Sequence, residues 1–406
     1  MGAEPRVVIA GCGPAGAMAG YLFARAGVPV VVLEKHGDFL RDFRGDTIHP
    51  STLEVLDELG LADRFLALPH NNVSTIVGRS VSGQALTFSL ARLPTRFPYI
   101  AFVPQWDFLE FLTKEATRFP AFTLKRQAEA IDLLQHGGVV SGVRYRDPDG
   151  THDLAAPLVI GADGRTSVTR DAAALPRIES SPPMDVFWFR LPRRADELEA
   201  VAGRLGVGKI CVMLARGDYW QIAYVIRKGG AEAVRAAGLD AFHRDVISVA
   251  PELSDRVTEI RDWDDVKLLT VKADRLTRWH KPGYLAIGDA AHAMSPIGGI
   301  GINVAIQDAV VAANVLWKPL RDGAVAETNL AEVQHRRERA VRVIQAFQSA
   351  VQTRFLKPAL ESTRPLSFPL LVRLLARLPV LRDLPPRLVA FGISRPHVES
   401  PELSTA

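Results

Sequence analysis

A glycine-rich turn between a strand and a helix lies near the N-terminus and constrains the fold more than any other feature. Residues 6–10 suit a buried strand, the turn GCGPAG covers 11–16, a helical run stops at Gly27, and residues 28–34 suit a second strand. Glycine permits the tight turn and the approach of a pyrophosphate to the helix N-terminus, and a carboxylate after the second strand can accept hydrogen bonds from a ribose. A glycine cluster alone also occurs in structural turns. The β-α-β order predicts dinucleotide binding, and the residues expected to contact the nucleotide are Gly11, Gly13, Ala15, Gly16, Glu34 and Lys35.

The length of the chain leaves room for further domains around this unit. With 406 residues, 48% apolar and 23% charged, the chain is long enough for two or three packed domains and has a globular composition. Its two cysteines, Cys12 and Cys211, are too few for a disulfide framework or a four-ligand zinc site. We therefore expect no metal and a reducing, cytoplasmic setting.

The sequence contains neither an evident membrane span nor a nucleic-acid motif. The most apolar long segment, residues 296–317, is interrupted by Asn303, Gln307 and Asp308, so we expect no integral membrane segment. Residues 333–395 carry twelve Lys/Arg against three acidic residues, but no aromatic residues alternate with these charges. We expect a solvated basic surface and no nucleic-acid partner.

Leucines recur at helical spacing within this basic stretch. We interpret them as one face of a helix packed on the rest of the chain, and a membrane-surface helix is the alternative. These leucines are Leu371, Leu374, Leu375 and Leu378.

The apolar pattern changes twice after the first unit. Between residues 185 and 271 aromatic and β-branched runs predict an antiparallel sheet, with a hairpin turn at Arg216-Gly217 and a helix over 231–250. A strand at 284–287 and a long helix from Gly301 then resume the α/β pattern, and proline-broken helices follow residue 327. The predicted fold class is α/β (α+β). The predicted units are a Rossmann-type domain formed by residues 1–180, with strand insertions at 73–100, and by residues 274–326; an inserted antiparallel-sheet substrate domain, 181–273; and a helical C-terminal segment, 327–406.

The predicted hairpin separates two sets of side chains. A two-residue turn at Arg216-Gly217 places Val212, Gln221 and Ala223 on one face of the sheet. Met213, Trp220, Ile222 and Tyr224 then lie on the other face. A register slip of one residue would exchange the two faces.

Two further segments contain an aspartate next to a glycine. LVIGADGR spans 158–165 and GYLAIGDAAH spans 283–292. Together with the first glycine turn, they resemble the paired motifs of the class A flavoprotein monooxygenases of the para-hydroxybenzoate hydroxylase type, over nearly the whole chain and in the same order. The resemblance implies FAD as cofactor, with Asp289 on the ribityl chain and Asp163 near both the cofactor and a nicotinamide nucleotide. A second G-x-G-x-x-G motif is missing, so NAD(P)H is expected to bind transiently.

The resemblance extends to the glycine-rich run SPIGGIGIN of residues 295–303. Backbone N–H groups of such a loop, with the following helix N-terminus, suit the flavin's pyrimidine edge. The family often has glutamine where Ile300 stands, so this chain lacks a polar side chain at that position. The further cofactor-binding residues expected from the resemblance are Arg44, Gln105, Ala128, Asp163, Gly288, Asp289, Pro296, Gly299, Gly301, Ile302 and Asn303.

Few residues are candidates for a direct role in catalysis. His49 follows the Arg44 segment and either faces the flavin or begins a helix before Pro50, whereas His292 is expected to be packed in its loop. The resemblance favours the Gln221 face of the hairpin as the face that meets the flavin. The candidate catalytic residues are His49, Pro296 and Gln221.

The resemblance implies a single-component FAD-dependent monooxygenase. Such an enzyme uses NAD(P)H and O₂ to hydroxylate or epoxidise an aromatic or polyunsaturated small molecule through a flavin hydroperoxide. The alternative is an FAD-dependent oxidoreductase of the same fold that inserts no oxygen; a flavin-binding protein without turnover is a weaker one. We expect a monomer or a homodimer, and the sequence does not identify the substrate.

Overall fold

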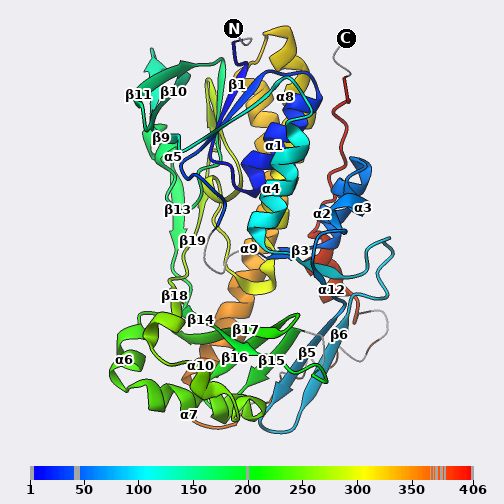
Figure 1. Cartoon of the computed structure of the whole chain (residues 1–406), viewed down its shortest axis with the longest axis vertical. Coiled ribbons are helices and arrows are strands. Elements are labelled where there is room, and N and C mark those ends of the chain that lie inside the picture. Colours follow the sequence, from blue (N-terminus) through cyan, green and yellow to red (C-terminus); the bar gives the residue numbers. More distant parts are fainter. Residues whose placement is uncertain are drawn as a thin grey trace.

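The molecule is elongated, with an α/β half at one end and a large sheet at the other (Figure 1). The computed structural model describes residues 4–40, 46–197, 201–365, 367–368, 370, 374, 378 and 381–403. Arg44, one of the predicted cofactor contacts, lies outside the described residues.

A mixed sheet of six described strands forms the centre of the α/β half. In sheet order the strands are β20 (His280–Lys281), β21 (Tyr284–Ala286), β12 (Leu158–Gly161), β1 (Val7–Ala10), β2 (Val30–Glu34) and β8 (Phe122–Arg126). All neighbours run parallel except β20, which pairs antiparallel with β21. Parallel strands have their carboxyl ends at the same edge of a sheet. The carboxyl ends of β1, β2, β12 and β21 therefore lie close together. The predicted β-α-β unit and fold class are confirmed.

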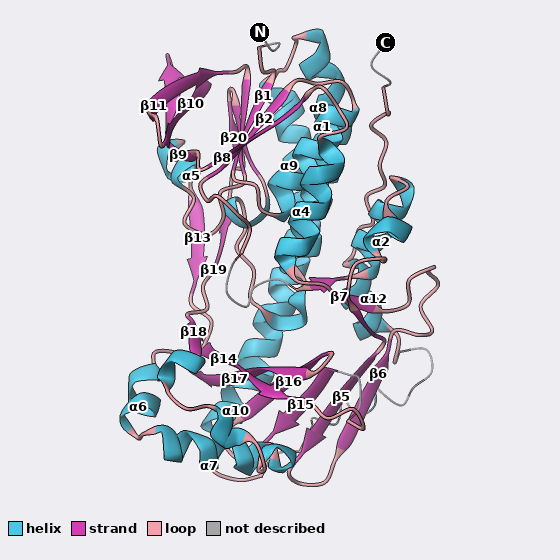
Figure 2. Cartoon of the chain, viewed as in Figure 1, coloured by secondary structure: helices cyan, strands magenta, loops and turns pink. Residues whose placement is uncertain are grey.

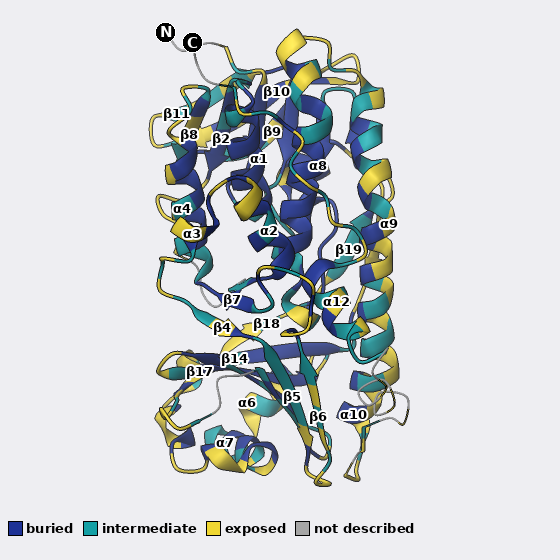
Figure 3. Cartoon of the chain, turned by 90° about the vertical axis from the view of Figure 1, so that its right-hand side faces the viewer, coloured by how far each residue is buried: buried dark blue, intermediate teal, exposed yellow. Residues whose placement is uncertain are grey.

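Three helices cover this sheet, the first packed on its strands and the other two packed on the first. They are α1 (Pro14–Arg25), α4 (Gln105–Ala116) and α8 (Gly301–Asp322), and Figure 3 shows α1 and α8 as largely buried. Among the described residues one segment, Ile297–Asp322, is long and apolar enough to cross a membrane, with a mean hydropathy of 1.5. However, 72% of its most apolar stretch is buried inside the protein, so packing in the core accounts for its composition.

Smaller elements surround the α/β core and join it to the large sheet. The ribbon of β13 (Arg177–Ser180) and β19 (Ala273–Leu276) connects the two halves of the molecule (Figure 2). These elements are α2 (Pro50–Glu58), α3 (Ala62–Phe65) and α5 (Val168–Ala172); the sheet of β3 (Thr47–Ile48), β7 (Ile100–Phe102) and β4 (Asn71–Val73); the sheet of β11 (Gly150–Ala155), β10 (Val139–Asp147) and β9 (Glu129–His136); and the ribbon of β13 (Arg177–Ser180) and β19 (Ala273–Leu276).

Seven described strands form the large sheet. In sheet order they are β18 (Lys267–Leu269), β14 (Met184–Pro192), β17 (Tyr219–Arg227), β16 (Ile210–Arg216), β15 (Val201–Leu205), β5 (Thr75–Ser80) and β6 (Ala85–Ser89). The first five come from the predicted middle segment, and β5 and β6 come from the strand insertion expected at 73–100. One face packs against α6 (Ala231–Ala236) and α7 (Leu239–Val249). The helix predicted over 231–250 is therefore two helices, which meet at Gly238 with a φ of 89°.

The hairpin of β16 and β17 turns one residue later than predicted. Arg216 pairs with Tyr219, so Gly217 and Asp218 form the turn. Moving a two-residue turn by one position shifts the cross-strand partner by two residues, and this preserves the face of each side chain. Met213, Trp220, Ile222 and Tyr224 pack on the α7 side, while Val212 and Ala223 belong to the apolar cluster on the opposite side. The predicted division into two faces is confirmed.

The C-terminal part is helical over two stretches. A continuous helix consists of α9 (Glu327–Val351), a π-helical turn (Gln352–Leu356) and α10 (Lys357–Glu361). Pro358, one of the prolines expected to break the helices after residue 327, therefore does not break this one, and that prediction was wrong. The wider π turn ends at Leu356, two residues before this proline, which lacks a backbone N–H. The second stretch is α12 (Leu384–Phe391). Leu374 and Leu378 are each 44% exposed, contrary to the predicted packed stripe, and Leu371 and Leu375 lie outside the described residues.

Residues 392–403 run as an extended segment back along the α/β half. Asn314 of α8 donates to His397 O and accepts from the N–H groups of Glu399 and Ser400. Arg25, the last residue of α1, donates to Ser400 O at 2.7 Å and pairs with Glu402. This C-terminal segment therefore fastens α8 to the end of α1.

Candidate active site

The first glycine turn leaves one position open at the N-terminus of α1. A Cβ on Gly11, whose φ is 96°, would lie 2.5 Å from Ala162 O, and a Cβ on Gly16 would lie 1.9 Å from Gly11 O. Both glycines are thus required for close backbone packing. In contrast, no described atom lies within 4 Å of a Cβ built on Gly13. The structure therefore leaves space for a phosphate group at the helix N-terminus, where backbone N–H groups favour an anion.

The carboxylate of Glu34 lies beside this turn. It is 7% exposed and accepts hydrogen bonds from the N–H groups of Cys12 at 3.2 Å and His36 at 3.1 Å. Ala128 N donates to the backbone oxygen of Glu34, which places the predicted contact Ala128 next to it, whereas the side chain of Lys35 is exposed. Glu34 is therefore fixed at the end of β2, as nucleotide ribose binding requires.

The two aspartate motifs meet at the ends of β12 and β21. Arg165 Nε lies 3.1 Å from Asp289 Oδ2, and each side chain is about a third exposed. The carboxylate of Asp163 instead accepts from the hydroxyl of Ser167 and from the backbone and hydroxyl of Thr169. Asp163 thus stabilises the start of α5, whereas the carboxylate of Asp289 is partly exposed to solvent.

A buried charged network supports the Gly288-Asp289 turn. Asp308 of α8 accepts from Gly288 N at 3.1 Å, from His292 Nε2 at 2.6 Å and from Arg337 Nε at 2.8 Å. Burial alone would raise the pKa of the Asp308 carboxyl, but His292 and Arg337 hold it below its usual value. His292 is packed, as expected. The sequence did not reveal the role of Asp308 and Arg337, because the two lie on different helices.

The glycine-rich loop is tied to the segment that carries His49. Gly298 and Gly299 have φ angles of 79° and 63°, and Thr47 Oγ1 donates to Gly299 O at 2.9 Å. Asn303 accepts from His49 N at 2.9 Å and from the Thr52 hydroxyl, so its side chain holds this loop against α2. The predicted contacts Pro296, Gly299, Gly301, Ile302 and Asn303 thus lie together before or within the first turn of α8, which has no side-chain cap.

Glutamines of the C-terminal helix hold the same loop from the other side. Gln348 Nε2 donates to Ser295 O at 3.0 Å and to Ile297 O at 2.9 Å, and Gln352 Nε2 donates to the Ser295 hydroxyl. Both glutamines are at most 5% exposed. Sequence reasoning missed them because a polar residue on a long helix is usually solvent-exposed.

His49 is fully buried at the start of α2. Its Nδ1 lies 2.7 Å from Val389 O, and its Nε2 has no hydrogen-bond partner among the described residues. Burial lowers the pKa of His49 to about 4, so the ring is neutral near pH 7, with Nδ1 as donor. Its catalytic role stays a prediction.

The face of the large sheet that carries Gln221 lies against the α/β half. Arg216 donates from Nε to Gln221 Oε1 at 3.0 Å and pairs with Asp46, just before β3, at 2.5 Å. Ile297 of the glycine-rich loop packs in the same apolar cluster as Trp188, Val212 and Ala223 of the sheet. Gln105 begins α4, and its backbone N–H is bonded to the Asp46 carboxylate.

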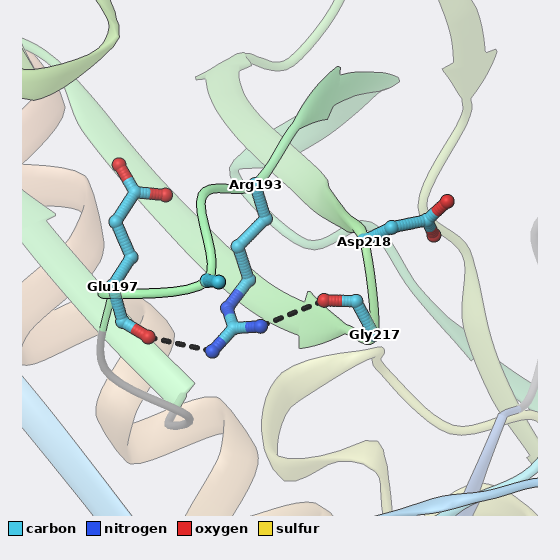
Figure 4. Close-up of a pocket in the computed structure, with 5 residues that line it drawn as sticks. Arg193, Glu197, Gly217 and Asp218 are labelled. Carbon is cyan, nitrogen blue, oxygen red and sulfur yellow. Dashed lines mark hydrogen bonds between the residues drawn. The ribbon is translucent and has the colours of Figure 1, made fainter.

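A surface hollow of about 540 Å³ lies at the turn of the β16–β17 hairpin (Figure 4). Arg193 crosses it and donates to Gly217 O at 2.7 Å and to Glu197 O. Neither the predicted cofactor residues nor the predicted catalytic residues line it, so we separate this hollow from the candidate active site. The lining residues are Arg193, Ala195, Glu197, Gly217 and Asp218.

The described residues fit a flavin dinucleotide. The open position at Gly13 suits the pyrophosphate, Glu34 suits the ribose, and Asp289 and the N-terminus of α8 suit the ribityl chain and the flavin ring. These loops define a flavoprotein of the Rossmann type. The chain belongs to the FAD-binding-domain family, which matches residues 4–347, and it is an FAD-dependent monooxygenase, a class that uses NAD(P)H.

Sequence relatives agree with this assignment, and a solved structure agrees with the fold. The chain is 33% identical to a 6-methylpretetramide 4-monooxygenase of Streptomyces rimosus over 359 residues, which are 86% of this chain and 84% of the relative. It is 28% identical to a rifampicin monooxygenase of Streptomyces venezuelae, covering 77% of this chain and 63% of that protein. The fold is similar to that of PqsL, a probable FAD-dependent monooxygenase from Pseudomonas aeruginosa, with a TM-score of 0.76 at 21% identity over 88% of this chain and 97% of PqsL.

Proposed function

We propose that the chain is a single-component monooxygenase that hydroxylates a fused-ring aromatic small molecule of the polyketide type. The observation that carries the proposal is the shared apolar cluster of Ile297 with Trp188, Val212 and Ala223. Because Ile297 belongs to the loop before α8, this sheet face and the glycine-rich loop pack against each other. The 33% identity to 6-methylpretetramide 4-monooxygenase supports an aromatic polyketide as the substrate class.

The chain's own residues have two roles, binding of the cofactor and exclusion of water. When bound, FAD takes reducing equivalents from NAD(P)H and activates O₂ for transfer of one oxygen atom. The backbone of the Gly299–Asn303 run and the N-terminus of α8 favour negative charge at the flavin ring. The apolar side chains around Ile297 keep water from the reacting region. The residues proposed to hold the cofactor are Gly11, Gly13, Ala15, Gly16, Glu34, Lys35, Arg44, Gln105, Ala128, Asp163, Gly288, Asp289, Pro296, Gly299, Gly301, Ile302 and Asn303.

An isotope experiment tests the reaction. Hydroxylation consumes one NAD(P)H, one O₂ and one proton for each substrate molecule, and yields the hydroxylated product, NAD(P)⁺ and water. We expect one oxygen atom of labelled O₂ in the product of a panel of fused-ring phenols and ketones, with NAD(P)H oxidation matching product formation. Product formation at the same rate without O₂ would instead support an oxidoreductase that inserts no oxygen. An epoxide product from a polyunsaturated member of the panel would extend the substrate class.

The cytoplasmic setting and the monomeric or homodimeric state remain proposals. Both cysteines are free and buried, which suits a reducing compartment. Thiol counting on freshly lysed cells and the molecular mass in solution would test the two proposals.

A further inference from the structure

The side-chain amide of Gln221 lies on the sheet face that meets the glycine-rich loop, and only its oxygen has a hydrogen-bond partner. Gln221 is 3% exposed, and its Oε1 accepts the hydrogen bond from Arg216 Nε at 3.0 Å. Its Nε2 donates to no group among the described residues. Unlike His49 Nε2, which is fully buried, this atom is in contact with solvent. The NH₂ group therefore has no protein acceptor and is available to donate to a bound molecule.

The orientation of the amide is set by its neighbours. Arg216 Nε can only donate, so the atom of Gln221 that faces it must be the oxygen. The guanidinium is itself held, because it pairs with Asp46 at 2.5 Å and lies 4.5 Å from the centre of the Phe102 ring. The side chains of Arg216 and Asp46 are only 6% and 13% exposed. The NH₂ group of Gln221 must therefore point away from Arg216.

The charges around the amide favour an electron-rich oxygen. Arg190 of β14 is the direct cross-strand partner of Gln221 and lies on the same face of the sheet, with its guanidinium 4.8 Å from the centre of the Tyr219 ring. The guanidinium of Arg216 thus contacts the amide, the exposed Arg190 adds a positive charge from the neighbouring strand, and Asp46 is a carboxylate that interacts with both. A partial or full negative charge on a bound oxygen is stabilised in such surroundings.

We propose that Gln221 Nε2 donates a hydrogen bond to an oxygen of the aromatic substrate, either a ring carbonyl or an ionised hydroxyl, and that Asp46 and Arg216 are positioning residues that hold the amide in this orientation. The inference rests on the proposed function only in taking this sheet face as the substrate face. A fixed donor on one substrate oxygen determines which ring carbon faces the cofactor loop, so the same contact sets the position of hydroxylation.

Binding of three probes of similar size tests the proposal. 2-Naphthol has a hydroxyl, 1-tetralone has a carbonyl, and naphthalene has neither. Each is titrated into the FAD-loaded full chain without NAD(P)H, and the change in flavin absorbance gives the dissociation constant. One hydrogen bond predicts that the two oxygen-bearing probes bind roughly two- to tenfold more tightly than naphthalene. A rise in 2-naphthol affinity as its hydroxyl ionises, without a change for 1-tetralone, identifies the ionised hydroxyl as the preferred partner.

The variant Gln221→Glu isolates the donor. The new side chain keeps the shape and the acceptor for Arg216 but replaces the NH₂ group by an oxygen. We expect the preference for the oxygen-bearing probes to disappear while naphthalene binding stays within twofold. The control Gln135→Glu makes the same chemical change on the exposed surface of β9 and should leave all three constants unchanged.

A second pair of variants tests the positioning role. Asp46→Asn keeps an oxygen acceptor for Arg216 and is expected to keep most of the preference, whereas Asp46→Ala is expected to lose it. A wild-type chain that binds all three probes equally, or binds none, overturns the proposal, and so does an unchanged preference in Gln221→Glu. If the preference is found but no labelled oxygen enters any product, the proposed function fails and the binding contact stands.

Discussion

The protonation state of His49 gives a quantitative test of the site. The ring is fully buried, and burial lowers the pKa of His49 from 6.5 to about 4. Above pH 6.5 the ring is neutral in both the folded and the unfolded chain and has no effect on the pH dependence of stability. As the pH falls below 6.5, the unfolded chain binds a proton that the folded chain does not, so the folded state loses stability. At 1.36 kcal/mol for each pKa unit, this loss reaches about 2 kcal/mol at about pH 5.

The variant His49→Asn removes this titration and keeps an amide donor for Val389 O. Urea unfolding in excess FAD, measured at several pH values between about pH 8 and pH 5, gives the free energy of unfolding for both proteins. We expect the wild-type chain to lose about 2 kcal/mol more than the variant over this range. His335→Asn, the same change at an exposed position on α9, serves as the control and should match the wild type. Equal losses in the wild type and His49→Asn would show that the folded chain protonates His49, as an acid-base role near neutral pH requires.

Three further changes test the support of the cofactor site. Asp289→Ala should weaken FAD binding by roughly 10- to 150-fold if its carboxylate accepts charge-assisted hydrogen bonds from the cofactor, as measured by flavin fluorescence; unchanged retention would count against that contact. Asp308→Asn leaves Arg337 without its buried carboxylate and should lower the free energy of unfolding by about 3–5 kcal/mol, and a loss below 1 kcal/mol would contradict a buried pair. Gln348→Leu removes two donors to the glycine-rich loop and should reduce FAD affinity by about tenfold or more, while the exposed control Gln135→Leu should not.

The parts of the fold that depend on local sequence were predictable. Gly11 and Gly16 specify a close backbone packing that few other structures need, and Gly13 leaves space at the helix N-terminus, so the first β-α-β unit follows from their spacing. The two faces of the β16–β17 hairpin also follow, because side chains alternate along a strand even when the turn moves by one residue. The helix over 231–250 was predicted as one piece because Gly238, which separates α6 from α7, lies in an otherwise helical pattern.

The supporting contacts were not predictable, because they join residues far apart in the chain. Asp308 was noted only as a polar interruption of an apolar segment, yet it organises Gly288, His292 and Arg337. Gln348 gives no sign in the sequence that it holds the backbone at Ser295. Such partners depend on tertiary packing, which residue patterns on a single helix do not encode.

The C-terminal segment 392–403 has a consequence for synthesis of the protein. The oxygen of Ser400 that Arg25 binds is made 375 residues after Arg25 itself. At about 5–20 residues per second, the ribosome needs roughly 20–75 s to cover that distance. During this interval the end of α1 lacks the extended segment that later covers it, so these contacts form only after the ribosome has made almost the whole chain.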